Sequence, residues 1–125
     1  MIKIVAAVGF GGAVGAIARY GLSSAAHHVL GHDFPVGSLF VNLLGSLAIG
    51  FLYFFLLDRF PANHELRGLL IIGFLGGLTT FSAFAFEVLV LLENSAWLKS
   101  FLYMLASVAG CVTMAWLGML AARQF

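Results

Sequence analysis

Two sets of polar side chains interrupt apolar sequence at intervals of four residues. The first set is Ser38, Asn42 and Ser46, and the second is Tyr103, Ser107 and Cys111. Residues four apart share one face of a helix, so each set predicts a polar stripe along a helix. The Asn42 amide has two donor hydrogens and an acceptor that need partners in a dry setting. It would either link two helices or contact a solute, and the spacing leaves both interpretations open.

The stretch at residues 73–86 combines poor helix formers with a strongly apolar setting. Gly76-Gly77 has high backbone entropy, and the β-branched pair Thr79-Thr80 carries hydroxyls that compete for backbone partners. These residues therefore predict a break near residues 76–80 of a membrane helix. Because lipid penalises unpaired backbone groups, we expect such a break to have a functional reason. The freed carbonyls and amides would face an ion, a substrate, water or a partner chain. Phe81 and Phe84 follow, three residues apart on one helical face.

The polar groups within the apolar stretches are mostly hydrogen-bond donors. Asn42 and the hydroxyls supply N–H and O–H groups, and the edge of a phenyl ring is positive. Glu87 is the only acid in these stretches, and it lies near an end. A cation path usually has acidic rings or carbonyl cages, whereas an anion needs several donors that replace its water stepwise. The residue types therefore favour a small-anion path and leave open which anion it takes.

The composition excludes several classes of protein. Of the 125 residues, 62% are hydrophobic and 9% are charged, whereas soluble domains average about 25% charged residues. The net charge of +1 gives no reason to expect a nucleic-acid partner. The single cysteine, Cys111, excludes an internal disulfide and any CxxC site. The four histidines fall in predicted loops and the spans hold no catalytic constellation, so we predict that the chain is not an enzyme.

Four apolar stretches are each close to the roughly 20 residues that cross a bilayer. They cover about residues 3–24, 36–57, 66–92 and 97–122, and we expect a single membrane domain over residues 1–125. Four spans place both termini on one side of the membrane. That side holds Lys3, Arg59, Arg67 and Arg123, whereas the other holds Lys99, with Arg19 near the end of the first span. This weak positive-inside bias leaves the orientation open and is compatible with an antiparallel dimer.

The first span carries small residues at Gly11 and Gly15, with Arg19 four residues further along. Small residues at this spacing let two helix backbones approach closely. A guanidinium near the membrane boundary has to reach water or a partner, because at the centre of a helix it costs roughly 2.5–3.5 kcal/mol or more. Arg19 therefore has either a structural role, holding a helix end or carbonyl groups, or a functional one.

Three segments, in this order on four spans of this length, resemble the Fluc (CrcB-type) family of small bacterial and archaeal fluoride channels. The segments are residues 11–20, which read GGAVGAIARY, residues 37–45, which read GSLFVNLLG, and residues 73–82, which read GFLGGLTTFS. The resemblance covers nearly the whole chain. It implies a fluoride-selective, multi-pass channel that gives passive fluoride export across the cytoplasmic (inner) membrane. It also implies an antiparallel dual-topology homodimer in lipid, with two fluoride pathways and a structural sodium ion on the two-fold axis.

The resemblance also implies roles for single residues at the centre of the chain. Asn42 would donate to fluoride, and the ring edges of Phe81 and Phe84 would line the path. The backbone carbonyls of Gly76 and Thr79 would bind the sodium ion.

The resemblance also implies roles for residues farther along the path. Ser38, Tyr103 and Ser107 would belong to a polar track, and Glu87 would lie toward a vestibule. Arg19 matches the arginine at the end of the first span of the family.

Two positions depart from the family pattern. Ala83 stands where a threonine is frequent, and Cys111 stands where a serine is frequent one turn beyond Ser107. Each change removes a good hydroxyl donor, because a thiol donates weakly and a methyl group does not donate. The polar track of this chain therefore has fewer strong donors than the family pattern at these two positions.

Two other classes of protein remain as alternatives. A small multidrug-type proton-coupled exporter also has four spans and dual topology, but it needs an acid embedded early in its first span, and this chain has none there. A non-transporting membrane assembly protein would use the glycines and Asn42 only to hold helices together.

Overall fold

The computed structural model describes all residues from 1 to 125, and they form helices joined by short connections. The elements are α1 (Ile2–Leu30), α2 (Val36–Arg59), α3 (His64–Arg67), the π-helical η1 (Gly68–Leu75), α4 (Gly76–Leu78), α5 (Phe81–Glu93) and α6 (Trp97–Ala122). Four helical segments are long and apolar enough to cross a membrane: α1, α2, the segment His64–Glu93, which runs from α3 to α5, and α6. The predicted all-α architecture with four spanning helices is confirmed.

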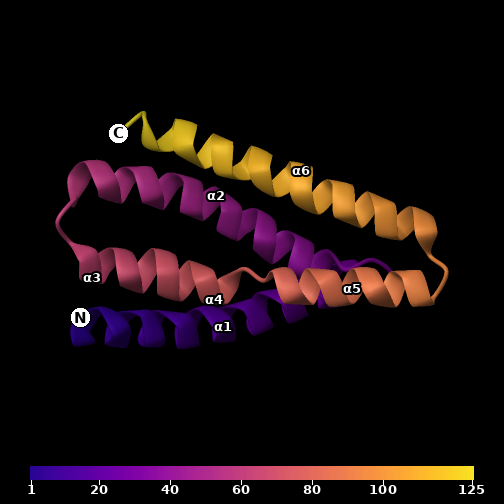
Figure 1. Cartoon of the computed structure of the whole chain (residues 1–125). Coiled ribbons are helices and arrows are strands. Elements are labelled where there is room, and N and C mark those ends of the chain that lie inside the picture. The colour runs from indigo at the N-terminus through magenta and orange to yellow at the C-terminus, as the bar shows by residue number, and fades with distance from the viewer.

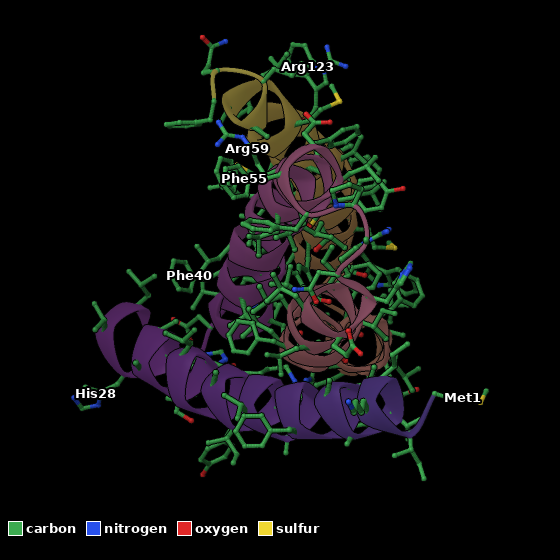
Figure 2. The ribbon with its side chains drawn as sticks, turned by 90° about the vertical axis from the view of Figure 1, so that its left-hand side faces the viewer. Met1, His28, Phe40, Phe55, Arg59 and Arg123 are labelled. Carbon is green, nitrogen blue, oxygen red and sulfur yellow. The ribbon has the colours of Figure 1, made fainter.

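The four segments run alternately in opposite directions, so both termini lie at the same end of the molecule (Figure 1). Seen along the bundle, α6 and α1 lie at opposite edges, with α2 and the segment from α3 to α5 between them (Figure 2). The most extensive packing joins α2 to α6 and α1 to η1, whereas α5 and α6 make few contacts. The arrangement therefore leaves α6 and the third segment apart on one side of α2.

Glycines bring the backbones of neighbouring helices into contact. A Cβ on Gly11 or Gly15 would lie 2.1–2.2 Å from a carbonyl oxygen of η1, which is too close for any side chain. A Cβ on Gly50 of α2 would lie 2.0 Å from the carbonyl oxygen of Ala115 in α6. Small residues are what membrane helices use for close packing. These glycines therefore fix how far α1 stands from η1 and α2 from α6.

Few side chains are buried inside the chain. Only 18 of the 125 residues are buried, and the apolar core consists mainly of Val41, Leu75 and Leu78 with their neighbours. Large apolar side chains point outward along every long helix, among them Phe10, Phe81 and Trp116. Because such a surface is costly in water, its natural surroundings are lipid or another apolar protein face.

Two residues of extended backbone lie between α4 and α5. Thr79 has φ −86° and ψ 149°, and Thr80 has φ −150° and ψ 125°. The Thr79 hydroxyl and amide both donate to the Leu75 carbonyl, which ends the helical bonding of the preceding turn. The Thr80 hydroxyl accepts from the Ala83 amide at 3.2 Å and so begins α5 as an N-cap.

The first helix is longer than the apolar stretch that predicts it. It continues to Leu30 and ends at Gly31, whose φ of 87° suits glycine and stops the helix. His27 and His28 therefore lie in the last turns of α1, and His64 begins α3. The prediction that all four histidines lie in loops is wrong for these three, because hydropathy marks where a helix leaves the apolar layer and not where its hydrogen bonding ends.

Candidate functional site

Asn42 of α2 is bound to the extended backbone of the third segment by both ends of its amide. Its Oδ1 accepts from the Thr80 amide at 2.9 Å, and its Nδ2 donates to the Thr80 carbonyl at 3.1 Å. The pair resembles one rung of a β-ladder, and it supplies partners for two groups that a helix would otherwise have bonded. One N–H of Nδ2 stays free, because a side-chain amide carries two.

The Asn42 contact leaves nearby carbonyls without their usual partners. In a continuous helix the Gly76 carbonyl would accept from the Thr80 amide, which instead donates to Asn42. In the same way the Thr79 carbonyl would accept from the Ala83 amide, which donates to the Thr80 hydroxyl. No backbone amide donates to either carbonyl. Two unpaired oxygens thus lie close together in sequence at the centre of the apolar segment.

Arg19 ties α1 to the same stretch of backbone. Its Nε donates to the Gly77 carbonyl at 3.1 Å, and the contact is partly buried. A guanidinium at this depth needs such a partner, and Gly77 offers a carbonyl from the end of α4. The contact corresponds to the structural interpretation of Arg19, in which it holds carbonyl groups.

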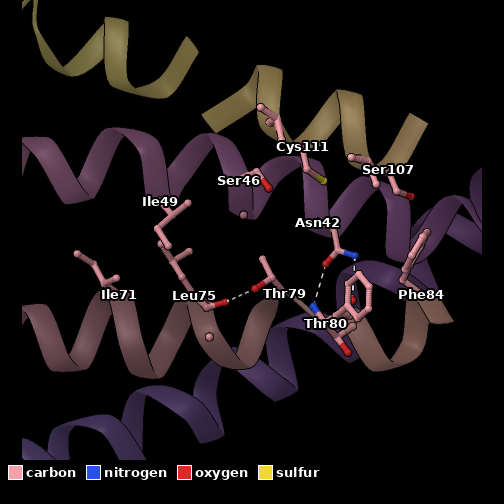
Figure 3. A pocket seen from close by; sticks show the side chains of 15 residues that line it. Asn42, Ser46, Ile49, Ile71, Leu75, Thr79, Thr80, Phe84, Ser107 and Cys111 are labelled. Atoms are coloured by element: carbon pink, nitrogen blue, oxygen red, sulfur yellow. Dashed lines mark hydrogen bonds between the residues drawn. The ribbon is translucent and has the colours of Figure 1, made fainter. Parts of the chain in front are cut away.

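A groove lies between α6 and the third segment, with α2 as its floor (Figure 3). Its volume is about 430 Å³. The polar or aromatic side chains that line it are Asn42, Ser46, Thr79, Thr80, Phe81, Phe84, Ser107 and Cys111, and Gly76 is also part of its wall. Ser107 is 8% exposed, and its Oγ is buried without a hydrogen-bond partner. A buried hydroxyl without a partner is costly, and this one belongs to a residue of the groove wall.

One carboxylate and two hydroxyls meet beyond the groove. Ser38 donates to Glu87 Oε1 at 2.7 Å, and the Tyr103 hydroxyl donates to Glu87 Oε2 at 2.5 Å. The group joins α5 to α2 and α6, with which α5 otherwise makes few contacts. The Tyr103 ring is fully buried and is met edge-on by Phe84, with ring centroids 5.2 Å apart, and by Phe34, at 5.5 Å.

Phe81 and Phe84 lie at the mouth of the groove on the first turn of α5. Their ring centroids are 5.2 Å apart and the ring planes are tilted by 47°. They differ greatly in burial, since Phe84 is 8% exposed and Phe81 is 76% exposed. Phe84 is held between the groove and Tyr103, whereas Phe81 projects away from its own copy of the chain. Lipid or another apolar protein surface therefore surrounds most of the Phe81 ring.

Helices α2 and α6 run in the same direction (Figure 1). The same sequence offset separates Ser38 from Tyr103, which share Glu87, and Gly50 from Ala115, which touch through backbone. We call the paired positions between them levels. Level one is Ser38 with Tyr103, level two is Asn42 with Ser107, and level three is Ser46 with Cys111. Each step along a helix is about 6 Å, so the three levels span about 12 Å.

The positions predicted from the sequence fall into three groups in space. Six line the groove, namely Asn42, Phe81, Phe84, Ser107, Gly76 and Thr79. Ser38, Glu87 and Tyr103 form the hydrogen-bonded group at level one, and Arg19 lies behind the extended residues.

Two contacts of the site were not predicted from the sequence. Thr80 is the partner of Asn42, and its N-cap position before Phe81 was a signal for the start of a helix. Phe34, which covers Tyr103, gave no signal because it lies in a connection.

The fold and the groove define a multi-pass membrane protein whose polar groups face one side of α2. A model of the family described as "CrcB-like protein, Camphor Resistance (CrcB)" matches residues 6–119. The chain belongs to this family.

Curated relatives match nearly the full chain, and three illustrate the range. A protein of Coxiella burnetii is 48% identical over 111 residues, which are 88% of this chain and 90% of that protein. A protein of Magnetococcus marinus is 44% identical over 119 residues, 95% of this chain and 97% of its own. One from Geobacter sulfurreducens is 43% identical over 120 residues, with shares of 96% and 97%. All three are named "Fluoride-specific ion channel FluC", so they are channels and not enzymes, and the resemblance inferred from the three segments is confirmed.

Proposed function

We propose that the chain forms a fluoride-selective channel that gives passive fluoride export across the cytoplasmic membrane. The observation that carries the proposal is the set of relatives named as fluoride-specific channels, which match 88–96% of the chain. The groove supports it, because the groove offers neutral donors and ring edges and no basic side chain. Such contacts bind a small anion weakly enough that it can leave again.

The second part of the proposal is that the working channel is an antiparallel dual-topology homodimer in lipid. The polar levels of one copy cover about 12 Å, whereas the hydrocarbon layer is about 30 Å thick. The groove is open on one side, and Phe81 projects outward with 76% of its surface exposed. An inverted second copy would cover the groove and continue the path with its own levels. The weak charge bias between the two ends is compatible with both orientations.

The third part concerns the interruption of the third span, which we interpret as functional. The extended backbone at Thr79 and Thr80 leaves the carbonyls of Gly76 and Thr79 unpaired at membrane depth. Unpaired backbone oxygens are suitable ligands for a hard cation. These two carbonyls would be the ligands for the structural sodium ion that the family resemblance implies. When bound, the ion would compensate unpaired oxygens and join the copies, and it is not itself transported.

Along the path, the anion would exchange water for protein donors one level at a time. At level two, the free N–H of Asn42 and the Ser107 hydroxyl would donate, and the positive edges of Phe81 and Phe84 would face the anion. Level one differs, since both hydroxyls there already donate to Glu87. An anion at that level competes with the carboxylate for the same hydrogens, so Glu87 has to release at least one of them.

Purified protein in liposomes loaded with fluoride tests the proposal with a fluoride electrode. Fluoride should leave the vesicles passively, without a proton or sodium gradient, and chloride should leave far more slowly. Equal release of both anions would overturn the selectivity, and no release from correctly folded dimers would overturn channel function. Efflux of a cationic dye driven by protons would instead favour the multidrug-type exporter.

A further inference from the structure

Ser46 lies at level three, for which the function proposed above names no donor. The hydroxyl of a serine or threonine within a helix often bonds back to the carbonyl four residues earlier. Thr79 and Thr113 do so in this chain, whereas Ser46 makes no such hydrogen bond. Ser46 lines the groove, and its hydroxyl and the Cys111 thiol are both directed into it (Figure 3). The Ser46 hydroxyl is therefore a free donor in the wall of the groove.

A second free donor, Ser107, lies one level away on the neighbouring helix α6. Ser107 is 8% exposed, its Oγ has no partner, and it lines the same groove. A buried hydroxyl without a partner is unfavourable unless a ligand or water accepts its hydrogen. Two residues with unpaired hydroxyls, one on α2 and one on α6, thus line the same groove at adjacent levels, which points to a solute that passes from one to the other.

We propose that Ser46 is a fluoride-contacting residue that supplies the donor of level three. This inference rests on the proposed function, because it takes the groove as the fluoride path. The α6 residue paired with Ser46 at this level is Cys111, whose thiol is a weak donor. Fluoride that leaves Ser107 would therefore find its next strong donor on α2 and not on α6.

Level three is also the last polar level of this copy. At the next level Gly50 meets the Ala115 carbonyl with no room for a side chain, because a Cβ there would lie 2.0 Å from the oxygen. Loss of the Ser46 hydroxyl would leave a gap in the donor series, and Cys111 cannot fill it.

Fluoride efflux from liposomes tests the inference with Ser46→Ala, Cys111→Ser and the double variant. Removal of one hydroxyl hydrogen bond should slow efflux by about tenfold in Ser46→Ala. Cys111→Ser should raise the rate, and in the double variant the new hydroxyl on α6 should restore most of what Ser46→Ala loses. Thr113→Ala is the matched control, because its hydroxyl is bound to the Ala109 carbonyl and is exposed, so its rate should equal that of the unmodified chain. The dimer fraction is measured for every variant.

The outcomes separate this inference from the proposed function. Rapid efflux from the unmodified chain together with an equal rate in Ser46→Ala would overturn the role of Ser46 and leave the channel assignment intact. A double variant as slow as Ser46→Ala would overturn the idea that the level needs a hydroxyl from either helix. Absence of fluoride efflux from the unmodified chain would overturn the proposed function and the inference with it.

Discussion

Replacement of Asn42 by alanine should destabilise the protein strongly, because it removes both hydrogen bonds to Thr80. The Thr80 amide and carbonyl would then lie at membrane depth without partners. Interhelical hydrogen bonds in membranes average about 0.6 kcal/mol each, whereas a buried polar group left unpaired costs about 1–3 kcal/mol. The second effect governs here, since the extended backbone offers Thr80 no helical alternative. We expect a loss of about 2–4 kcal/mol, or about 30- to 700-fold in the folding equilibrium.

The free energy of unfolding in mixed micelles measures this loss, and two variants calibrate it. Asn42→Asp is neutral at low pH, where it keeps an acceptor for the Thr80 amide and an O–H donor for the Thr80 carbonyl, so there it should lose less stability than Asn42→Ala. Leu44→Ala changes an exposed residue of the same helix and should have little effect. An Asn42→Ala protein with an unchanged unfolding free energy would refute the reasoning, because it would mean that Thr80 finds other partners.

Fluoride efflux per amount of folded protein then separates the two roles left open for Asn42. If Asn42 only links helices, the protein that remains folded should conduct at the normal rate. If its second N–H also donates to fluoride, folded Asn42→Ala protein should conduct at least about tenfold more slowly. We expect the second result.

Three further predictions concern the ring edges, the guanidinium and the glycine contacts. Phe81→Ile and Phe84→Ile should both slow fluoride efflux, but only the Phe84 change should also lower stability, by about 1 kcal/mol, because only that ring is buried. Arg19→Lys should lower the unfolding free energy by about 1–3 kcal/mol, because lysine cannot reproduce the Nε hydrogen bond to α4; an unchanged value would mean that the contact contributes nothing. Gly15→Ala should lower the free energy of unfolding, since its methyl group would lie 2.1 Å from a backbone oxygen of η1, whereas Gly12→Ala, with 3.8 Å to the nearest atom, should leave it nearly unchanged.

Local periodicity was enough to predict which residues share a face. Ser38, Asn42 and Ser46 follow one another at four-residue intervals, and a helix places them on one side regardless of the rest of the fold. Hydropathy likewise predicts four apolar segments, because each segment alone has to satisfy its backbone groups in lipid. Such features depend on residues close together in sequence, and the structure bears them out.

Long-range contacts were beyond the reach of the sequence. Nothing local indicates that Asn42 meets the Thr80 backbone, or that Arg19 meets Gly77, because these contacts depend on how three helices pack. The register of α2 on α6 is decided by where Gly50 permits close approach. The sequence therefore predicts the polar stripes but not which side chains oppose each other across the groove.

The register of α2 and α6 restricts how this chain can vary in length. One residue inserted into either helix between the group at Glu87 and the contact at Gly50 would rotate everything beyond it by about 100°. All donors that follow the insertion in that helix would then face away from the groove. In α2, a bulky residue would also replace Gly50 at the backbone contact with α6. Substitutions can alter one rung at a time, but insertions and deletions within this part of either helix would misalign the whole ladder at once.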